Sequence, residues 1–176
     1  MTRATRTNAP RLILGHGASG TAASMRAHVE GLKERGVEAV AIDLPKGNAE
    51  RAVPRFEAAA GDALATTAIG GHSYGGRVAS MLAAEKKVAA LVLLSYPLHR
   101  PGHPDQVRVE HWPRISCPVL LLSGGSDPFA RIDLLDMYVK RELVRAELHT
   151  YPGVGHGLAP VLDDALDRVA AFLKRV

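Results

Sequence analysis

The sequence predicts a doubly wound α/β fold, in which helices cover both faces of a mostly parallel six-stranded sheet. Two observations lead to this prediction. Short apolar runs alternate with segments of helical periodicity along the chain. Most of these runs are almost continuously apolar, as expected for strands that are buried on both faces of a parallel sheet. Repeated strand–helix units of this kind are joined by right-handed crossovers, and active sites in such sheets lie at the carboxyl ends of the strands.

The six expected strands are short apolar blocks separated by turn or helix signals. They are residues 11–15, 37–44, 66–71, 88–95, 118–124 and 145–151. The last block differs from the others, because apolar and polar side chains alternate between Ala146 and Thr150. This alternation is typical of an edge strand that has one wetter face.

The helical segments carry apolar residues at spacings of three and four. In the first segment this pattern covers residues 22–32 and stops before Gly36, a residue type that favours helix ends. The last helix follows Pro160 and has an apolar stripe over residues 162–173. A further helix follows Ser73 and consists mostly of small and apolar residues. We therefore expect that helix to pack tightly on the sheet.

The chain length and the apolar content bound the domain organisation. With 176 residues, the chain is long enough for one substantial core and too short for two comfortable ones. We expect a single domain over residues 11–176, preceded by a polar tail of residues 1–10. No apolar stretch approaches the length of a membrane span, and no apolar region of a secretory signal follows the N-terminal charges. These features predict a cytoplasmic protein without a membrane partner.

The charge pattern argues against a nucleic-acid-binding protein, and the cysteine content argues against a disulfide-stabilised one. The formal net charge is +4, but the 22 lysines and arginines are scattered and form no basic run, which argues against a nucleic-acid partner. Cys117 is the only cysteine, so the chain forms no internal disulfide. Its position before an apolar strand predicts a buried thiol, and the composition fits a reducing compartment.

One glycine-rich motif, GHGASG, follows the first expected strand and opens the first helix. It runs from Gly15 to Gly20, and Asp43 ends the next strand. In a dinucleotide site, glycines with this spacing admit a pyrophosphate to the helix N-terminus, and a carboxylate binds the ribose. A dinucleotide-binding oxidoreductase is therefore one interpretation. The alternative is that Asp43 is simply a polar residue that leaves a buried strand.

A second motif, GHSYG, lies between the third strand and the following helix, and it matches G-x-S-x-G. Such a nucleophile elbow holds its serine, here Ser73, in a strained turn at the top of the sheet. Side chains two positions away on either side would collide, which explains Gly71 and Gly75. The N–H of Tyr74 would point to the place where an oxyanion forms.

A serine hydroxyl needs a base to take its proton, and the base needs a third group to fix its tautomer. Asp127 lies just after the fifth strand, in SGGSDPF, and His156 lies after the sixth strand, in GVGHGL. Both loops are expected at the same edge of the sheet as Ser73. The sequence therefore predicts a catalytic triad of Ser73, Asp127 and His156, in the order serine, acid, histidine.

Each partner of the serine also has a purely structural interpretation. Asp127 precedes Pro128 and could cap the next helix. His156 stands between glycines and could be an ordinary loop residue. His149 is a rival base, but it lies within a strand pattern. The joint occurrence of the three residue types at three strand ends favours the triad.

The hydrolase interpretation also explains the first glycine-rich motif. An oxyanion hole needs a second N–H from the loop after the first strand, and we expect Ala18 to supply it. His16 and Gly17 would then shape that turn. The dinucleotide interpretation, in contrast, gives no role to the three triad residues.

These motifs resemble the α/β-hydrolase superfamily, and more closely the small dienelactone-hydrolase-related proteins of the KANL/Tex hydrolase-like group. The resemblance extends from about Leu12 to the C-terminus, and its most specific pieces are GHGAS, GHSYGGRVAS, SYPLHRPGHPDQVRVEHW and SGGSDPF. It implies a strand order of 2-1-3-4-5-6. It also implies Ser73 as nucleophile, Asp127 as acid and His156 as base.

The sequence departs from the larger family in two ways. The first two strands of the full fold are missing, and no insertion is large enough for a cap domain, which predicts an open and shallow site. A dienelactone hydrolase uses a cysteine nucleophile, whereas this chain has Ser73, so its specific reaction is not carried over.

The longest irregular segment, residues 96–116, separates the fourth and fifth strands and is long enough to be a functional loop. We expect Tyr96, His99 and Arg100 from this segment, together with His16, to contact the substrate. The segment contains three histidines, but their spacing fits no standard zinc pattern. A solvated loop is the favoured interpretation, and no metal is expected.

The sequence thus predicts a serine hydrolase that cleaves a small ester or a related acyl substrate through an acyl-enzyme, without a cofactor. The alternative is a non-catalytic, hydrolase-like interaction domain, in which the three residues are present but not used. A dinucleotide-binding oxidoreductase is the third interpretation.

Overall fold

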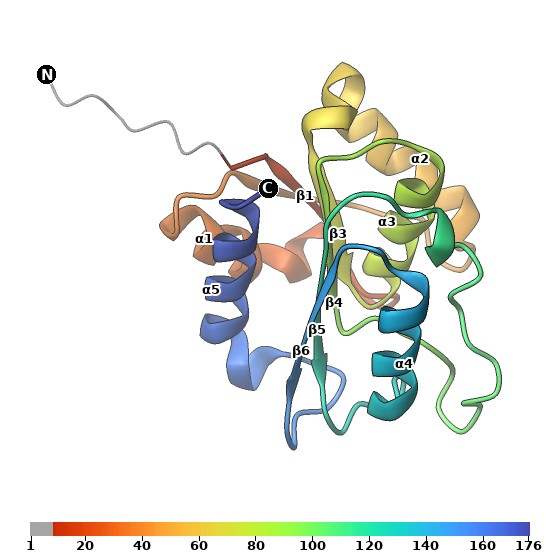
Figure 1. The fold of residues 1–176 in the computed structure, drawn as a ribbon. Coiled ribbons are helices and arrows are strands. Elements are labelled where there is room, and N and C mark those ends of the chain that lie inside the picture. Colours follow the sequence, from red (N-terminus) through yellow and green to blue (C-terminus); the bar gives the residue numbers. More distant parts are fainter. Residues whose placement is uncertain (1–8) are drawn as a thin grey trace, which may run out of the picture.

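A single sheet of six strands forms the centre of the protein in the computed structural model, which describes residues 9–176 (Figure 1). The strands are β1 (Leu12–Gly15), β2 (Ala39–Ile42), β3 (Ala68–His72), β4 (Ala90–Leu94), β5 (Val119–Gly124) and β6 (Ala146–Tyr151). Their order is β2-β1-β3-β4-β5-β6, and all neighbours are parallel. This confirms the six predicted strands, the strand order and the edge position of the last strand.

Five α-helices cover the sheet in two layers. They are α1 (Arg26–Glu34), α2 (Ala49–Ala60), α3 (Tyr74–Glu85), α4 (Ile132–Glu142) and α5 (Leu162–Leu173). Helices α1 and α5 lie on one face, and α2, α3 and α4 lie on the other (Figure 1). No cap domain is inserted within the described range, so the carboxyl edge of the sheet is crossed only by loops.

The continuously apolar strands are explained by a separate core on each face of the sheet. In β4, Leu91 and Leu93 belong to the core under α2, α3 and α4, while Val92 and Leu94 belong to the core under α1 and α5. Alternate residues of a strand point to opposite faces, so both sets must be apolar. Each such leucine contributes about 1.5–3 kcal/mol when it is fully buried.

Two helices differ from a simple reading of the periodicity. The first predicted helix divides into a 3-10 turn, η1 (Ala22–Met25), and α1, and Gly36 follows with φ = 76°, as expected for a helix stop. Helix α2 contains Pro54, which normally interrupts a helix. It begins because the Asn48 side chain accepts hydrogen bonds from the first backbone N–H groups.

The long segment over residues 96–116 is the predicted solvated loop only in its middle, where residues 100–103 are exposed. Leu98, Val109 and Trp112 are buried in the core under α2, α3 and α4. The His111 Nε2 atom is 2.7 Å from the Ser80 Oγ atom of α3, and both side chains are buried. Both ends of the segment are therefore packed into the domain, which its high content of proline and polar residues conceals.

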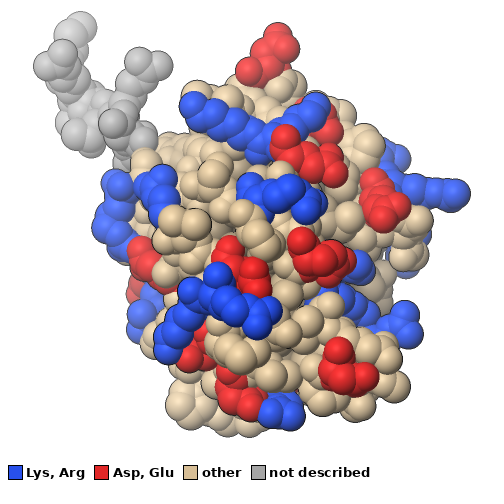
Figure 2. All heavy atoms as spheres, turned by 45° about the vertical axis from the view of Figure 1, so that its right-hand side comes forward, with Lys and Arg blue, Asp and Glu red and all other residues tan. Residues whose placement is uncertain are grey.

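On the face shown in Figure 2, lysines and arginines are interspersed with aspartates and glutamates, and no large region carries one sign. Cys117 is buried, and burial raises the pKa of its thiol to about 11. No helix within residues 9–176 is long and apolar enough to cross a membrane. Most of the predicted tail, residues 1–8, lies outside the described residues.

Candidate active site

Ser73 lies in the turn between β3 and α3, with its backbone in the left-handed region at φ = 49°. For a residue other than glycine this conformation costs on the order of 1–3 kcal/mol, so the surroundings must enforce it. The Ser73 N–H donates to the Leu94 carbonyl at 2.8 Å, and the Arg77 N–H donates to the Ser73 carbonyl at 3.0 Å. The turn is thus held by β4 on one side and by the first turn of α3 on the other.

Gly71 and Gly75 allow this turn to lie against the end of β1. A Cβ atom at Gly71 would be 2.4 Å from the Gly15 carbonyl oxygen, and a Cβ atom at Gly75 would be 2.3 Å from the Gly15 carbonyl carbon. The Gly75 N–H also donates to the His16 carbonyl at 3.0 Å. Steric contact therefore accounts for the glycines on both sides of Ser73, and for Gly15 in the other motif.

Two loops at the same edge of the sheet carry Asp127, after β5, and His156, after β6. The Ser126 N–H donates to the Val154 carbonyl at 2.9 Å, which joins the two loops through their backbones. They also approach closely at Gly124, where a Cβ atom would be 2.2 Å from the Val154 oxygen. The relative position of the acid and the imidazole is therefore set by main-chain packing.

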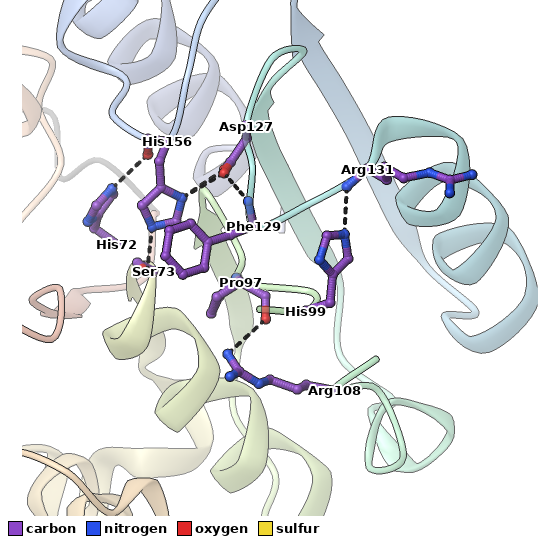
Figure 3. Close-up of polar contacts among 9 residues, drawn as sticks. All are labelled: His72, Ser73, Pro97, His99, Arg108, Asp127, Phe129, Arg131 and His156. Carbon is purple, nitrogen blue, oxygen red and sulfur yellow. Dashed lines mark hydrogen bonds and ion pairs between the residues drawn. The ribbon is translucent and has the colours of Figure 1, made fainter. Parts of the chain in front are cut away.

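The three side chains form one continuous hydrogen-bonded chain (Figure 3). The His156 Nδ1 atom is 2.8 Å from Asp127 Oδ2, and His156 Nε2 is 2.8 Å from Ser73 Oγ. A carboxylate only accepts hydrogen bonds, so Nδ1 carries the proton and Nε2 is left to accept one from the serine hydroxyl. The geometry thus places an imidazole in the tautomer that can deprotonate Ser73.

The acid is buried and satisfied, whereas the imidazole remains accessible. The Asp127 side chain is fully buried and also accepts the Phe129 N–H at 2.8 Å, while His156 keeps 24% of its side-chain surface exposed. Helix α4 begins only at Ile132, so this contact is a local turn and not the helix cap considered from the sequence. An accessible base next to a buried carboxylate suits proton transfer at the surface of the site.

Two rings pack around the His156 imidazole. The Phe129 ring centroid is 4.3 Å away, and the His72 ring centroid is 5.3 Å away. Burial lowers the pKa of His72, so its ring is neutral, and its Nε2–H donates to the His156 carbonyl oxygen at 3.1 Å. His72, which precedes Ser73, therefore ties the end of β3 to the loop that carries His156 (Figure 3).

The two predicted oxyanion donors, Ala18 and Tyr74, lie in the segments that follow β1 and β3. Tyr74 is the first residue of α3, and the N–H of such a residue has no partner within its helix. Ala18 is exposed in the turn after β1, and its N–H donates no hydrogen bond within the described part of the chain. Their contact with an oxyanion stays a prediction.

The contacts of the GHGASG turn favour a structural role over cofactor binding. His16 is buried, its Nε2 accepts the Leu44 N–H at 2.9 Å, and its Nδ1 donates to the Gly17 carbonyl at 2.7 Å. Asp43 accepts the Ala22 N–H at 2.8 Å. Asp43, which would have to bind the ribose of a dinucleotide, is thus hydrogen-bonded within the protein, and the dinucleotide interpretation is not supported. His16 shapes the turn and has no free polar atom for a substrate.

Two of the residues predicted to contact the substrate from the long segment use their polar atoms in hydrogen bonds within the protein. Tyr96 is buried and donates to the Arg108 carbonyl at 2.7 Å. His99 is buried too, and its Nε2 accepts the Arg131 N–H at 3.0 Å (Figure 3). These contacts do not support substrate binding by Tyr96 or His99, because they hold the segment in place. Arg100 is exposed, and its substrate contact stays a prediction.

Sequence reasoning missed His72 and Phe129, the two residues that pack on the imidazole. Both stand beside residues that it did identify, since His72 precedes Ser73 and Phe129 follows the Asp127–Pro128 pair. Their positions next to a candidate nucleophile and a candidate acid were the available signal. What the sequence does not show is that both rings turn toward the loop of β6.

A parallel sheet with a strained serine turn after β3, and with an acid and a histidine after β5 and β6, defines the α/β-hydrolase class of proteins. The sequence matches the family model described as an alpha/beta hydrolase domain over residues 8–172. The chain therefore belongs to the alpha/beta hydrolase domain family. The narrower resemblance to the KANL/Tex group stays a prediction.

Solved structures show the same fold at low sequence identity. The monoacylglycerol lipase of Paleococcus ferrophilus superposes with a TM-score of 0.80 and is 16% identical, over 95% of this chain and 96% of the lipase chain. The structure of Est1E from Butyrivibrio proteoclasticus with bound ferulic acid has a TM-score of 0.78 and 20% identity, over 99% of this chain and 92% of Est1E.

A sequence relative exists in Mycobacterium tuberculosis. This uncharacterized protein is 32% identical over 120 residues, which is 58% of this chain and 43% of the relative. The match thus spans less than half the length of that relative.

Proposed function

We propose that this protein is a serine esterase that hydrolyses a small ester or a related acyl substrate through an acyl-enzyme. The observation that carries the proposal is the unbroken chain from Ser73 Oγ to His156 Nε2 and from His156 Nδ1 to Asp127, at a serine turn with φ = 49°. The family and the lipase and esterase folds that superpose on the chain support the same reaction type.

In the first half-reaction, Ser73 Oγ attacks the ester carbonyl carbon while His156 Nε2 takes the hydroxyl proton. The negative charge that develops on the carbonyl oxygen is stabilised by the N–H groups of Tyr74 and Ala18. Asp127 stabilises the imidazolium that forms. The C–O bond to the alcohol then breaks, and His156 returns its proton to the leaving oxygen.

In the second half-reaction, water replaces the alcohol. His156 takes a proton from this water, which attacks the acyl carbon, and the acid product leaves as Ser73 regains its proton. Every group in this scheme is a side chain or a backbone amide of the chain itself. The reaction therefore requires no metal or cofactor.

The decisive experiment combines covalent labelling with turnover. We expect a fluorophosphonate probe to label the native protein, and p-nitrophenyl acetate to be hydrolysed. Ser73→Ala should abolish labelling and lower kcat by at least about 10³-fold, because removal of one triad member leaves only binding and oxyanion stabilisation. Ser116→Ala is the matched control, since Ser116 is exposed and lies before β5, at the opposite edge of the sheet.

Three results would contradict the proposal. Labelling that persists in Ser73→Ala would place the nucleophile elsewhere. A native protein that is folded, unlabelled and inactive toward short acyl esters would favour the non-catalytic interaction domain. Tight binding of a nicotinamide dinucleotide would restore the third interpretation.

A further inference from the structure

A hollow of about 400 Å³ opens beside the Ser73–His156 pair, between the start of α1 and the loop that leads into α5. Three of its lining residues are chain neighbours of the proposed machinery: Gly17 precedes Ala18, His72 precedes Ser73, and Gly157 follows His156. The volume falls within the range of about 300–1,000 Å³ that is usual for small-ligand sites. The hollow is therefore large enough, and near enough, to hold part of a substrate.

The lining of this hollow is apolar and carries no formal charge. No aspartate, glutamate, lysine or arginine lines it, although such residues make up 23% of the chain. Met25, Leu158 and Leu162 are among the apolar residues that line it. In contrast, a hollow at the opposite edge of the sheet is lined by several lysines and arginines, among them Lys86 and Arg145.

The two titratable groups in the lining are imidazoles, and both are neutral at pH 7. Burial is the main cause that lowers the pKa of His28 to about 4, and the proximity of a second imidazole, His72, lowers it further; burial also lowers the pKa of His72. The Ser24 hydroxyl, a further polar group, donates to the Thr21 carbonyl of its own turn. A charged group entering this hollow would lose part of its hydration without finding a group of opposite charge.

We propose that this hollow binds the acyl chain of the substrate and selects uncharged chains of several carbons over acetyl groups. The inference rests on the proposed esterase function and adds the class of substrate. The acyl chain stays covalently attached while water attacks, and that water enters along the path the alcohol has left. The alcohol side must therefore be open to solvent, whereas the acyl side can be enclosed and apolar.

The size of the effect follows from the hydrophobic contribution of each methylene. Burial of one methylene in the transition state raises kcat/KM by at most about fourfold. We expect kcat/KM for p-nitrophenyl esters to rise from acetate through hexanoate or octanoate, with a combined gain of at least tenfold. Chains that extend beyond the hollow should give no further gain.

Ala27→Trp tests the assignment, because Ala27 lies in the lining at an exposed position of α1. We expect this variant to lower the octanoate-to-acetate ratio of kcat/KM at least tenfold. Ala171→Trp is the matched control, since Ala171 is an exposed alanine of α5 that lines a different hollow beside Arg168 and Arg175. It should leave the ratio unchanged.

A binding measurement separates this inference from the proposed function. We expect the uncharged fluorescent probe N-phenyl-1-naphthylamine to bind the Ser73→Ala variant, and Ala27→Trp in that background to abolish binding. That result supports the hollow as an apolar binding site, whether or not the protein hydrolyses esters. If no ester is hydrolysed, only the proposed esterase function is overturned. Probe binding and a chain-length ratio that are both insensitive to Ala27→Trp would overturn the inference. If Ala27→Trp lowers kcat/KM only for acetate esters of long-chain alcohols, the hollow binds the alcohol and not the acyl chain.

Discussion

Two serine–histidine pairs involve serines at the start of α3 and within it, and the pairs differ in which partner donates the hydrogen bond. Ser73 Oγ is 2.8 Å from His156 Nε2, and Ser80 Oγ, two turns further along, is 2.7 Å from His111 Nε2. The Ser80 hydroxyl already donates to the Arg77 carbonyl at 2.7 Å. His111 must therefore donate its Nε2 proton to Ser80, whereas His156 accepts the proton of Ser73.

The comparison shows that a short serine–histidine distance does not make a nucleophile. A carboxylate fixes the tautomer of His156, and the strained turn presents Ser73 at an open edge. Ser80 and His111 are buried inside the domain, where no substrate can reach them. The first pair is arranged for proton transfer, and the second joins the long segment to α3.

The largest difference in kcat between variants at the two pairs is expected for a substitution of Asp127. Asp127→Asn keeps the shape of the side chain, but its amide can donate to Nδ1 and so stabilise the wrong tautomer. We expect kcat for p-nitrophenyl acetate to fall by about 10⁴-fold. Glu110→Gln, next to His111, should leave kcat unchanged within about twofold. Equal kcat values for Asp127→Asn and the native protein would remove the carboxylate from the mechanism.

A smaller effect is expected at His72, which positions the loop of His156 through its backbone carbonyl. His72→Leu removes the donor, and we expect kcat for the acetate ester to fall about tenfold to a hundredfold with little change in KM, because small displacements of reacting groups are costly. His72→Gln offers an amide N–H at similar reach and should recover most of the loss. If leucine and glutamine variants have the same kcat, the hydrogen bond does not position the imidazole.

At the second pair, the expected effect is on stability and not on turnover. Ser80→Ala leaves the buried His111 Nε2–H without an acceptor, which should lower the free energy of unfolding by about 1–3 kcal/mol. Urea denaturation gives the change, and kcat should stay within about twofold of the native value. A large loss of kcat without a loss of stability would instead give Ser80 a part in the reaction.

The sequence predicts the first pair well because it depends on general rules of the fold. Strands buried on both faces are continuously apolar, and the carboxyl ends of parallel strands meet at one edge. Ser73, Asp127 and His156 each follow such a strand, so their proximity could be inferred without coordinates. The glycines beside Ser73 added a steric reason that the structure reproduces.

The second pair could not be predicted, because it depends on how an irregular segment folds back on a helix. Residues 96–116 contain many prolines and charges, and such a composition predicts exposure. The burial of the two ends of this segment results from contacts such as that between His111 and Ser80, which leave no periodic pattern. For the same reason the sequence suggested substrate contacts for Tyr96 and His99, whose polar atoms the structure uses internally.

The buried histidine of the second pair should also make stability depend on pH. Burial lowers the pKa of His111 to about 4, below its ordinary value of 6.5. Between these values the unfolded chain binds a proton that the folded chain does not, so the stabilisation is complete above pH 6.5 and is lost as the pH falls toward 4. One such proton gives a slope of at most about 1.4 kcal/mol per pH unit.

The measurement is urea denaturation at several pH values from 7 to 4.5. The pKa of His28 is also lowered to about 4, so His28 contributes to the pH dependence in the same direction. The contribution of His111 is therefore the difference in pH dependence between the native protein and His111→Gln. We expect a shallower dependence on pH in this variant. Parallel curves for the two proteins would show that His111 does not titrate differently on folding.

The smallest expected effect comes from glycine substitutions, which should have opposite signs at the two serines. At Ser73 the backbone is left-handed, a conformation that glycine adopts freely, so Ser73→Gly should be more stable than Ser73→Ala by about 1 kcal/mol. At Ser80, inside α3, Ser80→Gly should be less stable than Ser80→Ala by about 1 kcal/mol. Urea denaturation of the four variants measures both differences. If glycine is the less stable residue at both positions, no backbone strain is stored at Ser73, and the turn does not hold the serine in the way the mechanism requires.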